Sequence, residues 1–153
     1  MKKAIARFIS TDDDIGVFFA RMALSIVFIP HGLQKLAGLF GGGGFSGTIA
    51  FFGSVGVPAV LAFLIIMAES LGSIALFLGF FGRFMAFGIG MVMTGAVFLV
   101  HLPNGFFMNW FGTQKGEGFE YHILAIGLAL ALMIKGSGKF SLDRIMHKFL
   151  SRG

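Results

Sequence analysis

Residues 57–81 read VPAVLAFLIIMAESLGSIALFLGFF, an almost uninterrupted apolar run with one ionisable side chain, Glu69, near its middle. A transmembrane helix needs about 20 mostly apolar residues, so this run is long enough to cross a bilayer. Only Gly82 separates it from a second apolar run at 83–102. The two runs therefore predict a tight antiparallel hairpin of membrane-spanning helices.

Two further apolar runs, at 15–39 and 119–134, complete a set of four candidate spans. The chain is 56% hydrophobic and 12% charged, whereas a soluble domain is about 25% charged. A chain of 153 residues could not bury so much apolar surface in water. We therefore expect an all-α integral membrane protein in which residues 1–140 form one four-helix bundle.

Lysine and arginine gather near the chain ends and at the turn between the second and third spans. Basic residues that flank spans favour the cytoplasmic side, so we expect both termini to be cytoplasmic. The basic residues that give the chain its net charge of +5 would then face the anionic lipid of the inner leaflet. A nucleic-acid partner is excluded because the chain has no basic face interleaved with aromatic residues. The lack of cysteine excludes disulfides and thiolate metal sites.

Residues 141–153, SLDRIMHKFLSRG, have the pattern of an amphipathic helix. Ser141 is a suitable N-cap and Asp143 falls in the first turn. The basic residues on one face are Arg144, Lys148 and Arg152, and the apolar residues opposite are Leu142, Ile145, Met146, Phe149 and Leu150. We expect this tail to lie on the inner leaflet; the alternative is a solvated tail.

Polar side chains within the spans are costly and usually face the bundle interior. With 1.5 Å of rise per residue, His31 lies about 24 Å and Glu69 about 19 Å from the inner face. Arg21 lies only about 9 Å from that face, where we expect it to snorkel to lipid phosphates. The remaining polar groups form a layer in the outer half: His31, Gln34, Lys35, Glu69, His101, Asn104, Glu120 and His122.

Glu69 is the member of this layer that is hardest to explain by solvation. It lies mid-span among small residues, and no ionisable side chain within a helical turn can neutralise it. Its carboxyl group is therefore either protonated or paired with a group on another helix. His31 is the partner closest in depth. A functional role is the first hypothesis, and a structural clasp between helices is the alternative.

The other members of the layer have simpler alternatives. Lys35 ends a span and could snorkel, and His101 and Asn104 could cap the third span at the interface. Glu120 and His122 are about 200° apart on a helical wheel. Both cannot face one ligand without local distortion, so one of them is expected to be solvated.

Residues 29–44, IPHGLQKLAGLFGGGG, join the first span to its outer loop. The four glycines lack the G-K-[ST] sequence and the preceding strand of a phosphate-binding loop. They predict a flexible outer loop, over which Phe45, Phe51 and Phe52 could form a lid. Pro30 is expected to kink the span, and such a break is tolerated beside a cavity. We therefore predict a polar pocket beneath the glycines.

From Arg21 to Asp143 the chain resembles the DoxX family of small four-span bacterial membrane proteins. The matching pieces, in order, are Arg21 followed by HGLQK at 31–35, GVP at 56–58, ESLG at 69–72, LGFFGRF at 78–84, His101 and GSGKFSLD at 136–143. The family usually has G-P-G where this chain has GSG at 136–138, a loop change with little bearing on chemistry. The resemblance implies a multi-pass protein of the bacterial inner membrane and a membrane subunit of redox systems such as thiosulfate:quinone oxidoreductase.

Our first functional hypothesis is a quinone-interacting redox subunit. Lys35 or His31 would meet a quinone carbonyl, Glu69 would relay protons, and Gln34, His101, Glu120 and His122 would line the ligand site. Quinone is thus a candidate cofactor, and no cofactor follows with certainty from the sequence. No residue set could oxidise thiosulfate alone, so a soluble redox partner would supply that half-reaction. Whether the chain catalyses a reaction by itself stays open.

Three alternatives use the same residues or surfaces. The pocket could belong to a non-enzymatic carrier for a small lipid-like or anionic molecule. His31 and His101 could be axial ligands of haem b, or could join Glu69 at a divalent metal. The chain could also be a scaffold that docks soluble partners on its basic face. The ligand and the oligomeric state, including a homo-oligomer, are left open.

Overall fold

The structure is a computed structural model that describes residues 2–151, and within that range it contains helices and no strands. The predicted all-α class is therefore confirmed. The main helices are α1 (Lys2–Phe8), α2 (Ile15–Ala37), α3 (Gly44–Ser54), α4 (Ala59–Glu69), α5 (Leu71–Leu78), α6 (Gly82–Ala96), α7 (Glu120–Lys135) and α8 (Leu142–Ser151). Short segments are the 3₁₀ helices η1 (Leu39–Gly41) and η3 (Leu102–Asn104) and the π-helix η2 (Val97–His101).

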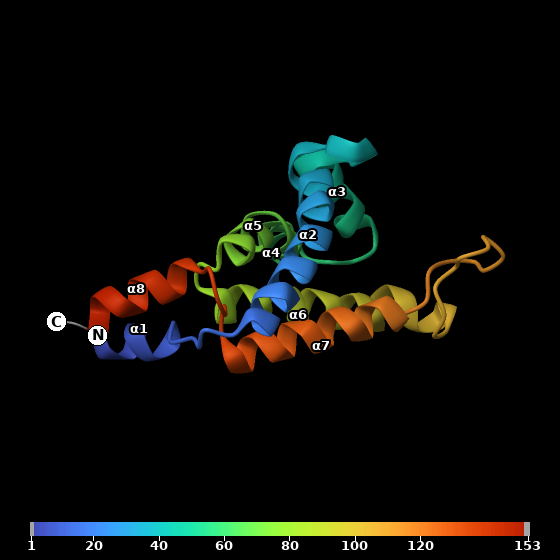
Figure 1. The fold of residues 1–153 in the computed structure, drawn as a ribbon. Helices are drawn as coiled ribbons and strands as arrows, with labels where there is room; N and C mark the ends of the chain where they lie inside the picture. The colour runs from blue at the N-terminus through green and yellow to red at the C-terminus, as the bar shows by residue number, and fades with distance from the viewer. Residues whose placement is uncertain (1, 152–153) are drawn as a thin grey trace.

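Three helical segments are long and apolar enough to cross a membrane: Ile15–Ala37, Ala59–Leu78 and Gly82–Asn104. They correspond to the first three predicted spans. The fourth run forms α7, which has 16 residues and a length of about 24 Å, and which packs antiparallel along α6 (Figure 1). A fourth crossing by α7 stays a prediction.

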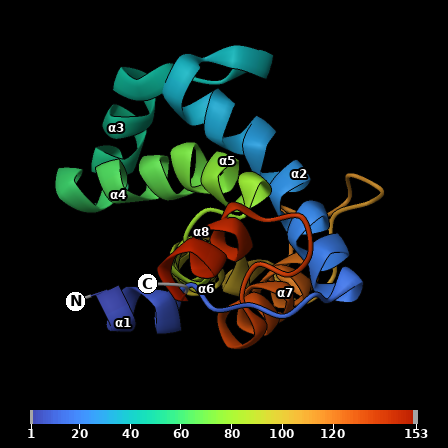
Figure 2. The ribbon, with the colours of Figure 1, turned by 60° about the vertical axis from the view of Figure 1, so that its left-hand side comes forward.

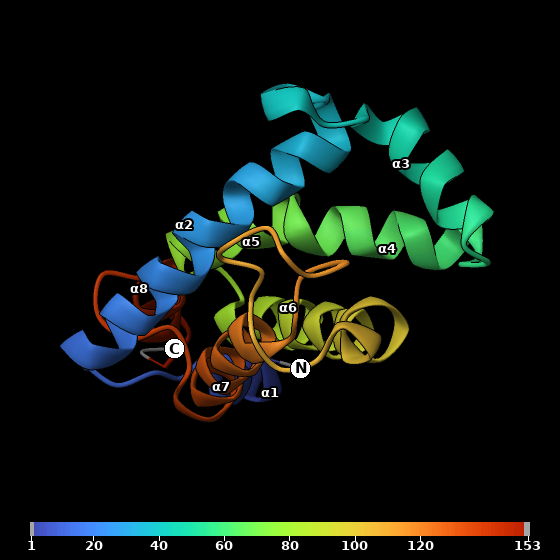
Figure 3. The same ribbon diagram turned by 90° about the vertical axis from the view of Figure 1, so that its right-hand side faces the viewer.

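The second predicted span is not one regular helix. It is interrupted at Ser70, where φ is −92° and ψ is −83°, directly after Glu69. The Ser73 hydroxyl donates to the carbonyl oxygens of Glu69 (2.6 Å) and Ser70 (2.9 Å), so these buried acceptors at the break are satisfied inside the protein. Figures 2 and 3 show α4 and α5 continuing in nearly the same direction across the break.

The hydrophobic core lies where α2, α5, α6 and α7 meet. Its buried members are Leu24, Phe28, Leu76, Ala86, Ile89, Met93, Ala125, Ala129 and Leu132. Outside this core, α2, α3 and α4 contact one another pairwise and form a triangle above α6 and α7 (Figure 3). Large apolar side chains such as Phe19, Val60 and Leu124 remain exposed on the outer surfaces, as expected for helices solvated by lipid.

The segment after the first span is more ordered than predicted. Residues 44–54, expected to be part of a flexible loop, form the helix α3. The Phe45 ring packs edge-on against Phe63 of α4, with ring centroids 6.3 Å apart. Pro30 lies inside α2, which continues as one helix to Ala37. The expectation of a free glycine-rich loop was therefore wrong, because apolar residues at helical spacing anchor this segment to α4.

Arg21 does not snorkel to the membrane surface, and that prediction was wrong. Its side chain is fully buried. The guanidinium donates to five carbonyl oxygens, those of Leu76, Phe77, Ser137, Lys139 and Phe140. An arginine side chain has five N–H donors, so the site satisfies all of them. Arg21 thus ties α2 to the end of α5 and to the loop that precedes α8.

Asp143 lies in the first turn of α8, as predicted, and its side chain is buried beside this cluster. Its carboxylate accepts from the backbone N–H of Phe81 (2.7 Å) and Gly82 (2.8 Å) and from the Ser137 hydroxyl (2.6 Å). It therefore caps the start of α6, where a negative charge also suits the helix dipole. Ser137 supplies a hydrogen bond that a proline at this position would lack.

The two ends of the described chain lie side by side. Helices α1 and α8 contact each other at one end of the molecule, and residues 105–119 form a loop at the far end of the α6–α7 pair (Figure 1). Ser141 accepts from the Arg144 N–H at 3.3 Å, which agrees with the predicted N-cap. Arg152, predicted to belong to the basic face of this helix, lies outside the described residues.

Candidate functional site

The candidate site is centred on an ion pair between α2 and α4. Lys35 Nζ lies 2.5 Å from Glu69 Oε2. Glu69 is 4% exposed, whereas the Lys35 side chain is 25% exposed. The mid-span carboxyl group is thus paired across helices, one of the two states that the sequence allowed.

A glycine allows the two helices to approach closely enough for this pair to form. A Cβ atom added at Gly32 would lie 2.2 Å from the Glu69 carbonyl oxygen and 2.4 Å from Ser70 Cα. The backbone of α2 therefore packs directly on the α4–α5 break. Lys35 follows Gly32 by one helical turn, so its side chain emerges on the same face and reaches the carboxylate.

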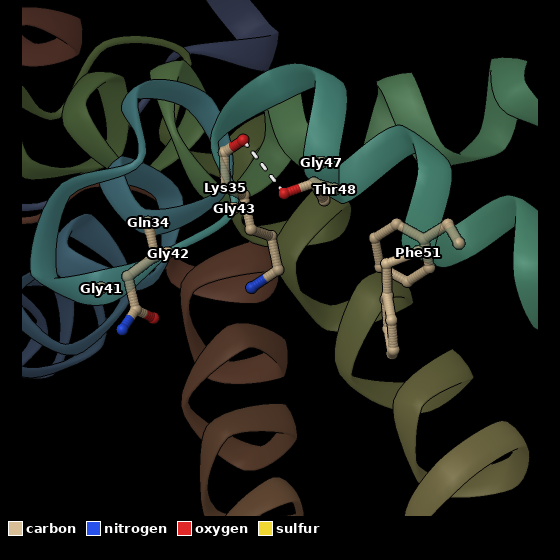
Figure 4. Close-up of a pocket in the computed structure, with 9 residues that line it drawn as sticks. Gln34, Lys35, Gly41, Gly42, Gly43, Gly47, Thr48 and Phe51 are labelled. Atoms are coloured by element: carbon tan, nitrogen blue, oxygen red, sulfur yellow. Dashed lines mark hydrogen bonds between the residues drawn. The ribbon is translucent and has the colours of Figure 1, made fainter.

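Lys35 also lines an open cavity of about 460 Å³. Gln34 and Lys35 form one side and Phe51 lies on the other (Figure 4), while the glycines at 41–43 complete the wall. The Thr48 hydroxyl donates to the Lys35 carbonyl at 3.2 Å, which fixes α3 against α2. The volume is in the usual range of small-molecule sites, and a mainly apolar wall with a few polar groups is also typical of them.

His31 is not the group that contacts Glu69. It is exposed on α2, and its ring lies beside Phe28 with centroids 6.4 Å apart. His31 and Glu69 have similar predicted depths in the membrane. However, Lys35, not His31, lies on the side of α2 that faces Glu69. The pairing of Glu69 with His31 was thus the wrong choice of partner, and a role for His31 in ligand binding stays a prediction.

A second polar cluster joins the ends of the third and fourth predicted spans. The rings of His101 and His122 lie with centroids 4.0 Å apart, and His122 is 5% exposed. His101 Nδ1 lies 2.8 Å from the Glu117 carbonyl oxygen, which also accepts from Asn104 Nδ2 at 3.1 Å. His101 belongs to the π-helix η2, a distortion that is frequent at functional sites.

Glu120 faces away from this histidine pair, as the angle between positions 120 and 122 indicated. Its Oε1 atom accepts from the Met108 N–H (2.9 Å) and from Trp110 Nε1 (3.3 Å). Glu120 thereby fastens the 105–119 loop to the start of α7. Glu120, His101 and His122 do not line the 460 Å³ cavity, so the predicted polar layer divides into two clusters.

Tyr121 is a candidate residue that the sequence reasoning missed. Its hydroxyl and the Nδ1 atom of His122 are buried without a hydrogen-bond partner among residues 2–151. Buried polar atoms of this kind usually hold water. Tyr121 is the only tyrosine in the chain, and its place between Glu120 and His122 is the signal that could have indicated it.

The arrangement is not that of a metal centre. Within the described part of the chain, no three His, Asp or Glu side chains converge closely enough to hold a metal ion. The two histidines considered for haem have different neighbours, because His31 lies beside Phe28 and His101 lies on His122. The geometry supports hydrogen bonding and proton transfer more directly than metal chemistry.

Comparison with known proteins identifies the family to which this chain belongs. A model of the DoxX family matches residues 16–102, which cover the first three helical segments and include both Lys35 and Glu69. The chain belongs to the DoxX family. The resemblance drawn from the sequence motifs is thereby confirmed, and no solved structure matches the chain.

Three curated DoxX-like relatives match over most of their lengths. "Putative oxidoreductase CatD" of Bacillus subtilis is 31% identical over 140 residues, covering 92% of this chain and 93% of the relative. "Inner membrane protein YqjF" of Escherichia coli is 31% identical over 137 residues, covering 89% and 95%. "Inner membrane protein YphA" of Escherichia coli is 29% identical over 133 residues, covering 84% and 88%.

Proposed function

We propose that this DoxX-family protein is a subunit of a redox system in the bacterial inner membrane and binds a quinone, or a similar small apolar molecule, in the 460 Å³ cavity. The observation that carries the proposal is the ion pair of Lys35 with the buried Glu69 at the wall of that cavity. The relatives' printed names, one an oxidoreductase and two inner membrane proteins, agree with the system and the location.

The charge state of the site favours a neutral ligand. Lys35 is already neutralised by Glu69 at 2.5 Å, so an anion entering the cavity would meet little net positive charge. A quinone instead needs apolar contact for its ring and hydrogen-bond donors for its carbonyls. Phe51 and Phe52 supply the first, and the ammonium of Lys35 and the amide of Gln34 supply the second.

The proposed chemistry is reduction of the quinone with proton delivery by the ion pair. Reduction to the quinol takes up two electrons and two protons. The electrons come from a soluble redox partner, and the protons reach the quinone oxygen through Lys35, which Glu69 reprotonates. Glu69 is a carboxylate in the ion pair, so it must itself take up a proton from solvent before it can reprotonate Lys35.

The test is quinone binding by the purified protein in mild detergent. A short-chain quinone should raise the thermal unfolding temperature, and Lys35→Met should remove most of that shift. Lys115→Met and Asp12→Asn are matched controls, because these exposed residues lie outside the cavity lining and should leave it unchanged. An unfolding temperature that no quinone alters would refute the proposal.

A carrier for a lipid-like molecule is the competing outcome of the same experiment. Glu69→Gln distinguishes the two functions in membranes that contain the redox partner. In a redox subunit this variant should abolish proton-coupled quinone reduction. In a carrier it should change only the affinity, and the ligand that stabilises the protein should then be an amphiphile rather than a quinone.

A further inference from the structure

A second cavity, of about 650 Å³, lies between α2, α5 and α8, at the end of the molecule where both termini lie (Figure 1). Most of its wall is apolar and includes Phe18, Met22, Phe77 and Ile145. Two basic residues of α8, Arg144 and Lys148, also line it. It is separate from the proposed quinone site, whose lining residues come from α2, α3 and the segment between them.

The positive charge available in this cavity comes from α8 and not from Arg21. Arg21 also lines the cavity, but its N–H groups are occupied by five carbonyl oxygens. Arg144 forms an ion pair with Asp13 through one nitrogen, Nη1. Lys148 has no carboxylate partner among residues 2–151. Lys148 and the remaining N–H groups of Arg144 are therefore the donors open to a ligand.

We infer that this cavity binds an anionic phospholipid, with the phosphate on Arg144 and Lys148 and an acyl chain along Phe18, Met22 and Phe77. A free anion would leave the apolar wall unused, and a neutral apolar ligand would leave Lys148 unpaired. An amphiphile with a negative head group satisfies both parts. Basic residues close to the membrane surface attract anionic lipids, and the amphipathic pattern of α8 predicts that this helix lies at that surface.

The shape of the cavity is held by buried contacts, which distinguishes it from general attraction to a charged surface. The Asp143 carboxylate at the start of α8 is bonded to the α5–α6 turn, and Arg21 holds the preceding loop against α2 and α5. These contacts fix Arg144 and Lys148 relative to the apolar wall. A specific lipid should therefore bind with defined stoichiometry.

The test is native mass spectrometry of the purified protein with phosphatidylglycerol, phosphatidylcholine or inorganic phosphate added separately. We expect one phosphatidylglycerol to be retained in preference to phosphatidylcholine. Each basic residue near anionic lipid contributes about a fivefold increase in affinity. The double variant Arg144→Gln/Lys148→Gln should therefore lose about 25-fold in phosphatidylglycerol affinity, and Arg144→Lys/Lys148→Arg should keep most of it.

The matched control is Lys135→Gln, which removes an exposed lysine at the same end of the molecule but outside the cavity lining. It should leave the preference unchanged. An equal loss in this control would show general surface attraction and overturn the inference, as would equal binding of the two lipids.

Competition by phosphate at the concentration of the lipid would overturn the inference in favour of a free-anion site. Thermal unfolding without lipid verifies that each variant is folded, and the Lys/Arg exchange variant tests the site even if the double glutamine variant unfolds.

Discussion

The partners of the Lys35–Glu69 pair differ in their access to water, and this difference has a measurable consequence. Glu69 is 4% exposed, while the Lys35 side chain is 25% exposed and can turn its ammonium outward. Removing one partner of a buried ion pair costs about 3–5 kcal/mol, because the other charge is left buried and unpaired. The cost should therefore depend on which partner is removed.

We expect Lys35→Met to destabilise the protein more than Glu69→Gln does. Lys35→Met leaves a buried carboxylate alone and should cost about 3 kcal/mol. Glu69→Gln leaves a lysine that reaches solvent and should cost about 1 kcal/mol. Chemical unfolding in detergent measures both, and the double variant should be more stable than Lys35→Met alone. The opposite order for the single variants would mean that the ammonium, not the carboxylate, is the trapped charge.

The sequence identified this pair only in part, and the reason is geometric. Glu69 was recognised because an ionisable residue in the middle of an apolar run needs a partner. For Lys35 the sequence predicts a place in the ligand site, with a snorkelling end residue as the alternative, and depth along the spans favours His31 as the partner of Glu69. Residue counting measures height along a helix, whereas the close approach at Gly32 decides which side of α2 faces Glu69. This close approach of two helices belongs to the tertiary structure, and the pattern of residues along the sequence does not predict it.

Arg21 gives a second test, because a lysine cannot replace a guanidinium that serves five acceptors. The Leu76 carbonyl also accepts from the Gly79 N–H at 2.9 Å, so four of the five acceptors depend on Arg21. A lysine ammonium has three donors, so Arg21→Lys would leave at least one of these four oxygens unpaired. Each unpaired buried acceptor costs about 1–3 kcal/mol, and we expect a loss in that range. Arg7→Lys, at an exposed position of α1, is the control and should have no measurable effect. If Arg21→Lys and Arg7→Lys have the same free energy of unfolding, the Arg21 guanidinium does not stabilise the contact of α2 with α5 and with the loop before α8.

Among the helices, the contact of α2 with the α4–α5 break depends on Gly32. We expect Gly32→Ala to force the helices apart, because its Cβ would lie 2.2 Å from the Glu69 carbonyl oxygen and backbone on both sides cannot move freely. Overpacking of this kind costs about 1–3 kcal/mol. The variant should also lose the stabilisation by quinone, since Lys35 would move away from Glu69.

Gly127 of α7 is the matched control for this variant. A Cβ at Gly127 would meet no atom within 4 Å, and alanine has the higher helix propensity by about 1 kcal/mol. Gly127→Ala should therefore be neutral or slightly stabilising in the same unfolding measurement. Equal losses at Gly32 and Gly127 would indicate that the close approach of α2 to α4 does not contribute to stability.

The helices themselves were predictable to different degrees. Long apolar runs predicted α2, α4–α5, α6 and α7 to within a few residues, because about 20 consecutive apolar residues are the sequence signal of a membrane helix. The break at Ser70 and the helix α3 were missed. Ser70 interrupts a run whose local sequence is helical, and the structure packs Gly32 of α2 directly against this break. In α3, glycine-rich composition suggested a loop, but contacts with α2 and α4 stabilise a helix of low intrinsic propensity.

The whole molecule has two distinct ends, and the distribution of charge between them predicts its orientation in the membrane. α1 and α8 lie together at one end, with the basic residues of both termini, while the 105–119 loop at the other end exposes Trp110 and Phe111. Trp and Phe at a membrane boundary favour the interface. The positive-inside rule then predicts that the end with the termini faces the cytoplasm.

The absence of cysteine makes this orientation directly measurable, because a single introduced cysteine is the only thiol in the chain. Ala4 on α1 and Thr113 in the 105–119 loop are both exposed. In intact cells, a membrane-impermeant maleimide should label Thr113→Cys and not Ala4→Cys, and permeabilising the inner membrane should expose both. Labelling of both positions in intact cells would place the two ends on the same side, which would contradict an odd number of crossings between residues 4 and 113. Labelling of Ala4→Cys alone would reverse the orientation and place the proposed phospholipid cavity in the outer leaflet.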